Sequence, residues 1–132
     1  MCLLKVDKIY KGTSKAIRIG YKVFENYNGE LTSFIAPAKK TLPTWVWIDE
    51  KDYRLKKHTG ILYTGEDYYP AGWHVYVELD DAKLFALLRY RDKYEVIHQV
   101  QCQGLLVEGM DALDREVRVY RYIKISKEVW HA

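Results

Sequence analysis

Hydrophobic and polar residues alternate along much of the chain, which is the pattern of β-strands that bury one face. The clearest early example covers residues 17–24, and residues 31–35 repeat it. Between the two stands Asn28-Gly29, a pair that tolerates positive φ angles and favours a tight turn. The pattern therefore predicts a β-hairpin in the first quarter of the chain.

The rest of the chain continues in the same way, with one exception. Alternation predicts further strands, at residues 3–9, 45–48, 61–63, 73–79, 94–102, 105–107 and 116–126. The exception is residues 81–90, where Ala82, Phe85 and Ala86 recur at helical spacing behind Asp80-Asp81, a good N-cap. Proline and glycine mark residues 36–44 and 65–72 as loops.

These elements predict an α+β protein. We expect a mostly antiparallel sheet, strongly twisted or barrel-like, with one short helix packed on it. The 132 residues suffice for a single β-rich domain over residues 1–132. No apolar run approaches the roughly 20 residues of a membrane span, and the start of the chain does not resemble a signal peptide. We therefore expect a cytoplasmic protein with no membrane contact.

Aromatic residues are unusually frequent and the charge is mildly basic. The chain has 12 tyrosines and 4 tryptophans, and its formal net charge is +3. Tyrosine and tryptophan favour both strands and binding surfaces, because a flat apolar ring ends in a polar group. A basic balance permits an anionic partner, such as a nucleotide, an RNA or an acidic protein surface.

One face of the last predicted strand is the strongest candidate site. Strict alternation places Arg118, Tyr120, Tyr122 and Lys124 on the same side of the sheet. Aromatic rings between cations suit a ligand that has both a base and a phosphate. The alternative is a solvated outer face on which the rings cover the stems of the basic residues.

A second pair of candidates lies on the strand before the predicted helix. His74 and Tyr76 alternate with Trp73, Val75 and Val77, so we expect them on the polar face of a half-buried strand. With the four residues of the last strand, they make the predicted ligand-binding set. The aromatic segments around Trp45-Trp47 and Tyr68-Tyr69 could add stacking contacts, although Trp45 and Trp47 fit a core equally well.

Motifs of known catalytic or metal chemistry are absent from the sequence. It has no glycine-rich phosphate loop, no HExxH and no GxSxG, and its two cysteines are not at zinc-ligand spacing. We therefore expect no catalytic residue, no metal and no cofactor.

Residues 71–82 resemble part of a group of small uncharacterised proteins of bacteriophages and other mobile elements. The shared pattern is a glycine, an aromatic residue, a histidine and a further aromatic residue, followed by Asp-Ala at a helix start. Gly20-Tyr21-Lys22-Val23, the interval Val100–Gly104 and Ile123–Ile125 are also similar to that group. The resemblance implies a host-takeover or anti-defence factor that acts in the host cytoplasm by binding a host protein or a signalling nucleotide.

A weaker resemblance links the chain to ADP-ribosyltransferase-like folds. Tyr10-Lys11-Gly12-Thr13-Ser14 is similar to the start of those folds, although Lys11 stands where the nicotinamide-site histidine would be. This resemblance implies NAD in a cleft beside Thr13 and Tyr76.

Three functions thus remain open from the sequence. The first is a non-catalytic phage-type accessory protein that binds a nucleotide signal or a host protein. The second is an RNA- or single-strand-binding module, whose affinity would fall steeply with salt. The third is an NAD-using enzyme related to ADP-ribosyltransferases. A homo-oligomer formed through an exposed strand edge is compatible with each of them.

Overall fold

The computed structural model describes residues 3–33, 41–54, 60–88 and 94–132. All strand pairs in this part of the chain are antiparallel, and a single short α-helix accompanies them, which confirms the predicted α+β class. The elements are, in order, β1 (Lys5–Ile9), β2 (Arg18–Tyr27), β3 (Glu30–Ser33), β4 (Trp47–Asp49), the 3₁₀-helix η1 (Glu50–Asp52), β5 (Ile61–Tyr63), β6 (Tyr68–Pro70), β7 (Trp73–Tyr76), α1 (Leu79–Leu88), β8 (Glu95–Met110) and β9 (Glu116–His131).

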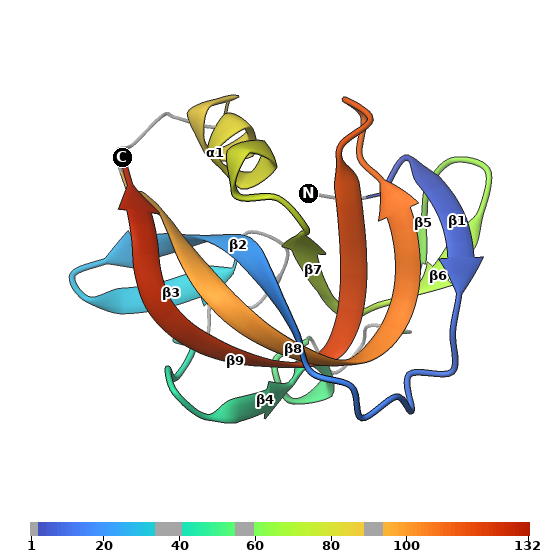
Figure 1. Ribbon diagram of the computed structural model, residues 1–132, viewed down its shortest axis with the longest axis horizontal. Coiled ribbons are helices and arrows are strands. Elements are labelled where there is room, and N and C mark those ends of the chain that lie inside the picture. Colours follow the sequence, from blue (N-terminus) through green and yellow to red (C-terminus); the bar gives the residue numbers. More distant parts are fainter. Residues whose placement is uncertain (1–2, 34–40, 55–59, 89–93) are drawn as a thin grey trace.

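Four of these strands close into a ring. β8 pairs with β2, β2 with β7, β7 with β9, and β9 again with β8. Figure 1 shows β8 and β9 as long curved strands that sweep around the molecule, with α1 above them. β1 pairs with β8, β3 with β2 and β4 with β9, while β5 and β6 form a separate small sheet. The expected twisted, barrel-like sheet is therefore present.

β2 and β7 share fewer paired residues than any other two neighbouring strands of the ring, and a buried lysine side chain adds to their contact. β2 and β7 share a single register pair, Tyr21 with Tyr76. One residue further along β2, the Lys22 Nζ donates a hydrogen bond of 2.8 Å to the backbone carbonyl of His74 on β7. Lys22 is only 2% exposed. A side chain thus continues the link where the backbone ladder between the two strands stops.

Gly20 lets β2 approach β7 at the same place. A Cβ atom added at Gly20 would overlap the Val75 Cγ1 and lie 3.1 Å from the Tyr76 carbonyl oxygen. We predict that Gly20→Ala lowers the free energy of unfolding by about 2 kcal/mol, because the inserted methyl forces the strands apart. Urea denaturation measures the loss. The double variant Gly20→Ala/Val75→Ala makes room for the methyl and should show a favourable coupling energy; strict additivity would contradict the steric explanation.

Two hydrophobic cores lie on opposite sides of the ring strands. Neighbouring residues belong to different cores, Phe24 to one and Val23 to the other. Ala82 and Ala86 of α1 belong to the same core as Val23, so this core lies outside the ring, under the helix. The core that contains Phe24 is enclosed by the ring and also includes Trp73. We call it the inner core.

Gly104 interrupts the alternation in the long hairpin. The inner core contains Cys102 on β8, and Leu105 packs against it, although residues three apart in a regular strand face opposite sides. The partner strand β9 behaves in the same way, with both Tyr120 and Ile123 in this core. Gly104 has a φ angle of 73°, a value that glycine adopts at little cost. The strand faces therefore change at this residue.

Several elements differ from their predicted bounds. β8 runs unbroken to Met110, whereas the sequence predicted an end at Cys102 followed by a separate segment, because glycine here bends the strand instead of ending it. Tyr68–Pro70, predicted as a loop, forms β6 and pairs with β5. The predicted hairpin is confirmed: Tyr27 pairs with Glu30 around Asn28 and Gly29, both with positive φ. Residues 34–35 and 89–90 of predicted elements lie outside the described residues.

Candidate functional site

A pocket of about 550 Å³ is lined in part by the ring strands β2, β8 and β9. Its walls come from the segment between β1 and β2 (residues 10–16, called here the 10–16 segment), from the start of β2, and from β8 and β9 beyond Gly104. Three cations line it, namely Lys11, Arg18 and Arg118. Glu108 is the one carboxylate among its described lining residues. We call this cavity the ring pocket.

The 10–16 segment is held against β8 by backbone hydrogen bonds. The Tyr10 N–H donates to the Leu106 carbonyl at 2.7 Å, and the Gly104 N–H donates to the Ser14 carbonyl at 3.1 Å. Gly12 has a φ angle of 74°, and a Cβ there would overlap the Leu106 side chain. The segment therefore forms a fixed wall that presents Lys11 and two hydroxyl residues to the ring pocket.

Arg118 has unused hydrogen-bonding capacity in this pocket. Its nearest carboxylate is Glu116, with 3.8 Å between Arg118 Nη2 and Glu116 Oε1. The Arg118 Nε is buried, and no hydrogen-bond acceptor for it is found among the described residues. Burial alone would lower the pKa of Arg118, but hydrogen bonding to Tyr120 and the nearby Glu108 and Glu116 raise it above its usual value. The guanidinium is thus a permanent cation in the wall of the ring pocket.

The carboxylate of the ring pocket is already engaged. The Tyr10 hydroxyl donates a hydrogen bond of 2.9 Å to Glu108 Oε1, and this bond raises the pKa of Tyr10. Tyr120 is 3% exposed, and burial together with the neighbouring Cys102 raises the pKa of its hydroxyl, an effect that Arg118 opposes. Burial raises the pKa of the Cys102 thiol to about 12, so this cysteine is not a nucleophile at neutral pH.

His74, a predicted site residue, is completely buried. The expectation that it lies on a polar strand face is wrong, because this face of β7 is covered by other elements. Its Nδ1 lies 3.2 Å from the Gly72 carbonyl and its Nε2 lies 3.1 Å from the Tyr69 hydroxyl. The Tyr69 hydroxyl in turn accepts the Leu3 N–H at 3.1 Å. Burial and the nearby Lys22 lower the pKa of His74 to about 3, so it stays neutral.

Tyr76 is also buried, on the same side of β7, so its predicted position on a polar face is wrong as well. Its hydroxyl donates a hydrogen bond of 2.8 Å to Asp111 Oδ2. Arg115 binds the same carboxylate oxygen, with Nη2 at 2.7 Å, and its guanidinium lies 5.3 Å from the centre of the Tyr76 ring. These three residues form a closed structural network beneath α1.

The four predicted residues of β9 do not share one face. Arg118 and Tyr120 line the ring pocket, whereas Tyr122 and Lys124 are not among its lining residues. Tyr122 pairs with Gln103 and Lys124 with Gln101, before the change of faces at Gly104, and both are partly exposed. Strict alternation was wrong here because it ignores this break.

Arg18 lines the ring pocket but was not predicted from the sequence. Arg18 begins β2 opposite Cys102, while Arg118 lies on β9, 100 positions later in the chain. Only the folded ring brings the two guanidiniums to one pocket. Thr13 and Ser14 also line the ring pocket. The sequence pointed to these two residues only through the weaker resemblance to ADP-ribosyltransferase-like folds.

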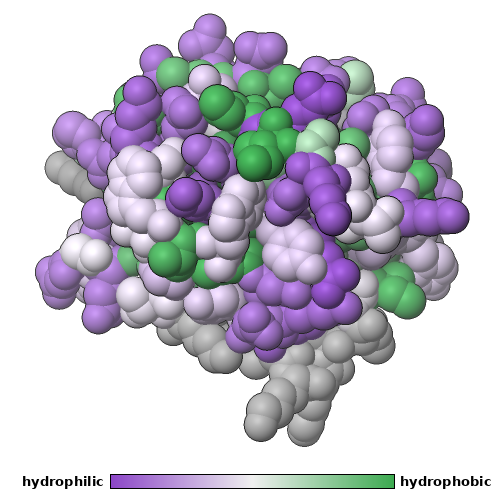
Figure 2. Space-filling view, turned by 60° about the horizontal axis from the view of Figure 1, so that its bottom comes forward, coloured by the Kyte–Doolittle hydropathy of each residue, from purple (hydrophilic) through white to green (hydrophobic). Residues whose placement is uncertain are grey.

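The exposed aromatic side chains lie elsewhere. Trp45 is 61% exposed and Trp47 is 39% exposed, so neither is a core residue. Tyr68 is exposed, but its neighbour Tyr69 is buried. Figure 2, in which the bottom of Figure 1 comes forward, shows hydrophobic patches separated by hydrophilic side chains and not one continuous apolar area.

Two structural findings and the comparisons complete the description. Among the described residues, no three His, Cys, Asp or Glu side chains are grouped so that they could hold a metal ion. In the same part of the chain, the α-helix is ten residues long, short of the roughly 20 needed to cross a bilayer. We find no match to this chain among protein-family models, curated proteins or solved structures.

Proposed function

We propose that this protein binds a nucleotide in the ring pocket and holds it without chemical change. The observation that supports the proposal most directly is the charge of the pocket: its described lining residues include the cations Lys11, Arg18 and Arg118 but one carboxylate, Glu108, which accepts a hydrogen bond from Tyr10. Guanidinium groups recognise phosphate through paired hydrogen bonds.

The other walls of the ring pocket suit the remainder of a nucleotide. A volume of about 550 Å³ lies within the usual range for small-molecule sites. Tyr10 and Leu105 offer apolar surface for a base, while Thr13 and Ser14 offer hydroxyl groups for a sugar or a phosphate. The phenols of Tyr10 and Tyr120 are protonated at neutral pH, as tyrosine ordinarily is, and their raised pKa values leave this state unchanged.

The biological role that we propose is sequestration of a nucleotide signal, as in an anti-defence or host-takeover protein of a phage. The basis is the sequence resemblance of residues 71–82 together with a pocket fitted for anions. NAD is one of the nucleotides to be tested, since Thr13 lines the ring pocket, although the Tyr76 hydroxyl is bound to Asp111. Binding to RNA would instead produce a steep dependence of affinity on salt.

A host-protein contact is the second candidate function, and one local feature favours it. Trp45, Val46 and Trp47 are three successive exposed hydrophobic residues, and Trp47 is the first residue of the edge strand β4. Trp45 has a φ angle of 64°, a strained value for a large side chain, and gains no burial in return. Trp45→Ala should abolish capture of a host protein while it leaves nucleotide binding unchanged.

Arg118→Gln is expected to weaken nucleotide binding at least tenfold, because glutamine keeps the size but loses the charge and the paired donors. Isothermal titration calorimetry with AMP, ATP and NAD measures the dissociation constants. Lys127→Gln, at an exposed position of the same strand, is the matched control and should bind as the wild type does. The proposal fails if none of the three nucleotides binds the wild type, or if Arg118→Gln binds equally well.

A further inference from the structure

Glu108 lines the ring pocket without a cation bound to it. The ion pairs found among the described residues do not include Glu108. Its register partner on β9 is Arg118, yet the carboxylate within 4 Å of the Arg118 guanidinium belongs to Glu116, at 3.8 Å. The carboxylate of Glu108 therefore does not serve as the direct counter-ion of a described basic residue.

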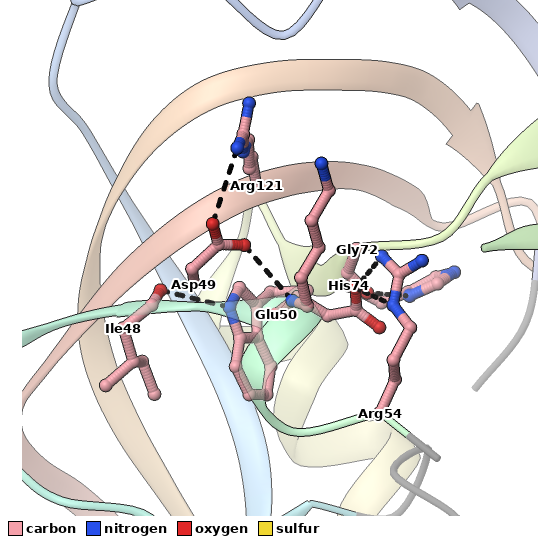
Figure 3. A network of polar contacts seen from close by, with 9 residues as sticks. Ile48, Asp49, Glu50, Arg54, Gly72, His74 and Arg121 are labelled. Carbon is pink, nitrogen blue, oxygen red and sulfur yellow. Dashed lines mark hydrogen bonds and ion pairs between the residues drawn. The ribbon is translucent and has the colours of Figure 1, made fainter. Parts of the chain in front are cut away.

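A smaller pocket of about 290 Å³ shows the more usual arrangement of carboxylates. Asp49 and Glu50 both line it. Asp49 Oδ2 lies 3.5 Å from Arg121 Nη2, and Glu50 forms an ion pair with Arg54. Figure 3 shows Arg121 above Asp49, with Glu50 and Arg54 beyond them. These two carboxylates are engaged within the protein, which sets them apart from the carboxylate of the ring pocket.

Tyr10 fixes the position of the Glu108 carboxylate and leaves much of it unused. The Tyr10 hydroxyl donates a hydrogen bond of 2.9 Å to Glu108 Oε1, and no second hydrogen bond to this carboxylate is found among the described residues. A carboxylate can accept about four hydrogen bonds, two at each oxygen. Glu108 is only half-buried and faces the pocket, so its remaining acceptor sites are open to a ligand.

The arginines of the ring pocket lie toward Tyr120. Both Arg18 and Arg118 oppose the rise in the pKa of Tyr120, so both cations are near this ring. Arg18 pairs with Cys102, which precedes Glu108 by six residues on β8, or at most about 20 Å along a strand. A nucleotide whose phosphate binds these arginines therefore has room to extend its base toward Glu108.

We propose that the ring pocket selects guanine nucleotides and that Glu108 recognises the base. This inference rests on the proposed function and adds the class of base. Guanine presents two adjacent donors, N1–H and the 2-amino group, and a carboxylate accepts a hydrogen bond from each. Adenine and cytosine instead place an acceptor nitrogen beside the amino group, and a carboxylate repels that nitrogen. Uracil presents a single N–H between two carbonyl groups.

Isothermal titration calorimetry with GMP, IMP and AMP tests this choice of base on the wild type. GMP should bind at least tenfold more tightly than AMP, which is the discrimination expected from one well-placed pair of hydrogen bonds. IMP keeps the N1–H of guanine but lacks the 2-amino group. Its affinity should therefore lie between those of the other two nucleotides.

Glu108→Gln is expected to reverse the preference in favour of AMP. The glutamine amide offers one acceptor and one donor, which suits adenine but turns a donor toward a donor of guanine. Loss of the negative charge strengthens the binding of every nucleotide, so the readout is the ratio of the two dissociation constants. Glu116→Gln is the matched control: it removes an exposed carboxylate near Arg118 that does not line the ring pocket, and the ratio should stay unchanged.

The outcomes separate the two proposals. An affinity for GMP no higher than that for AMP, or a preference for GMP that Glu108→Gln retains, would overturn the guanine inference while nucleotide binding still stands. Equal affinity of the wild type for GMP and IMP would overturn it too, and this comparison needs no variant. If none of the three nucleotides binds the wild type, both proposals fail. Thermal unfolding establishes that each variant is folded.

Discussion

Replacing Asp111 with asparagine is expected to lower the free energy of unfolding by about 3 kcal/mol, because it leaves the buried Arg115 without its counter-ion. Asp111 is 4% exposed and Arg115 is 8% exposed. The Asp111 carboxylate accepts hydrogen bonds from the Tyr76 hydroxyl, from the Arg115 side chain and from the backbone N–H groups of Leu113 and Arg115. Asparagine keeps the shape of this acceptor but not its charge.

The same network predicts a loss of stability in acid. Burial alone would raise the pKa of Asp111, but the hydrogen bonds from Arg115, Tyr76 and the backbone lower it below its usual value. A carboxyl group whose pKa is lower in the folded state stabilises the protein above its unfolded pKa of about 4. This contribution disappears as the pH falls through the folded-state pKa. The difference in stability between wild type and Asp111→Asn should therefore shrink below about pH 4.

Urea denaturation between pH 2.5 and 7 measures both effects. Asp114→Asn is the matched control, since Asp114 is exposed and has a φ angle of 56°, which asparagine also tolerates. The control should remain within about 0.5 kcal/mol of the wild type. A similarly small effect of Asp111→Asn, with no dependence on pH, would show that the network does not stabilise the fold.

The difference in the free energy of unfolding between the wild type and the variant Lys22→Met is expected to shift in favour of the wild type by about 3 kcal/mol from pH 8 to pH 10.5. Burial lowers the pKa of Lys22 from 10.5 to about 8. In this pH window the folded protein has released the Lys22 proton, whereas the unfolded chain still binds it. The free energy of unfolding therefore increases with pH in this window. Below pH 8 the folded protein also binds the proton, so the contribution of Lys22 to stability is at its minimum there.

Methionine at position 22 retains the length and the apolar stem of the lysine but cannot titrate. It also removes the donor to the His74 carbonyl at the closure of β2 and β7, a loss that does not depend on pH. Equilibrium unfolding of the two proteins at intervals from pH 7 to 10.5 isolates the titration. Lys127→Met, at an exposed position, is the control for replacing a lysine with methionine where the side chain is not buried. Parallel curves for wild type and Lys22→Met would mean that the buried amine keeps its ordinary pKa.

Local patterns in the sequence predicted those elements that depend on neighbouring residues. Asn28-Gly29 specified the hairpin of β2 and β3, because its backbone conformations match a two-residue turn. Ala82 and Ala86, one helical turn apart, indicated the helix face that packs on the sheet. Alternation alone also singled out Arg118 and Tyr120, and both line the ring pocket.

The same patterns misplaced other candidates for a physical reason. Alternation states only that successive side chains point to opposite sides, and it does not state what covers each side. His74 and Tyr76 were therefore expected at a surface, whereas α1 and the start of the chain bury that face. Tyr122 and Lys124 were grouped with Arg118 because the bend at Gly104 has no signal in a hydrophobic pattern.

The sequence by itself determined the α+β class, the turn at Asn28-Gly29, the single helix and the basic, aromatic character of the chain, because each depends on residue types and on contacts between near neighbours. Only the tertiary structure decided which sides of the strands are buried, how β2 meets β7 through Gly20 and Lys22, and which cations share a pocket. Arg18 and Arg118 line the same pocket because the ring closes, and ring closure depends on pairing between strands far apart in the chain.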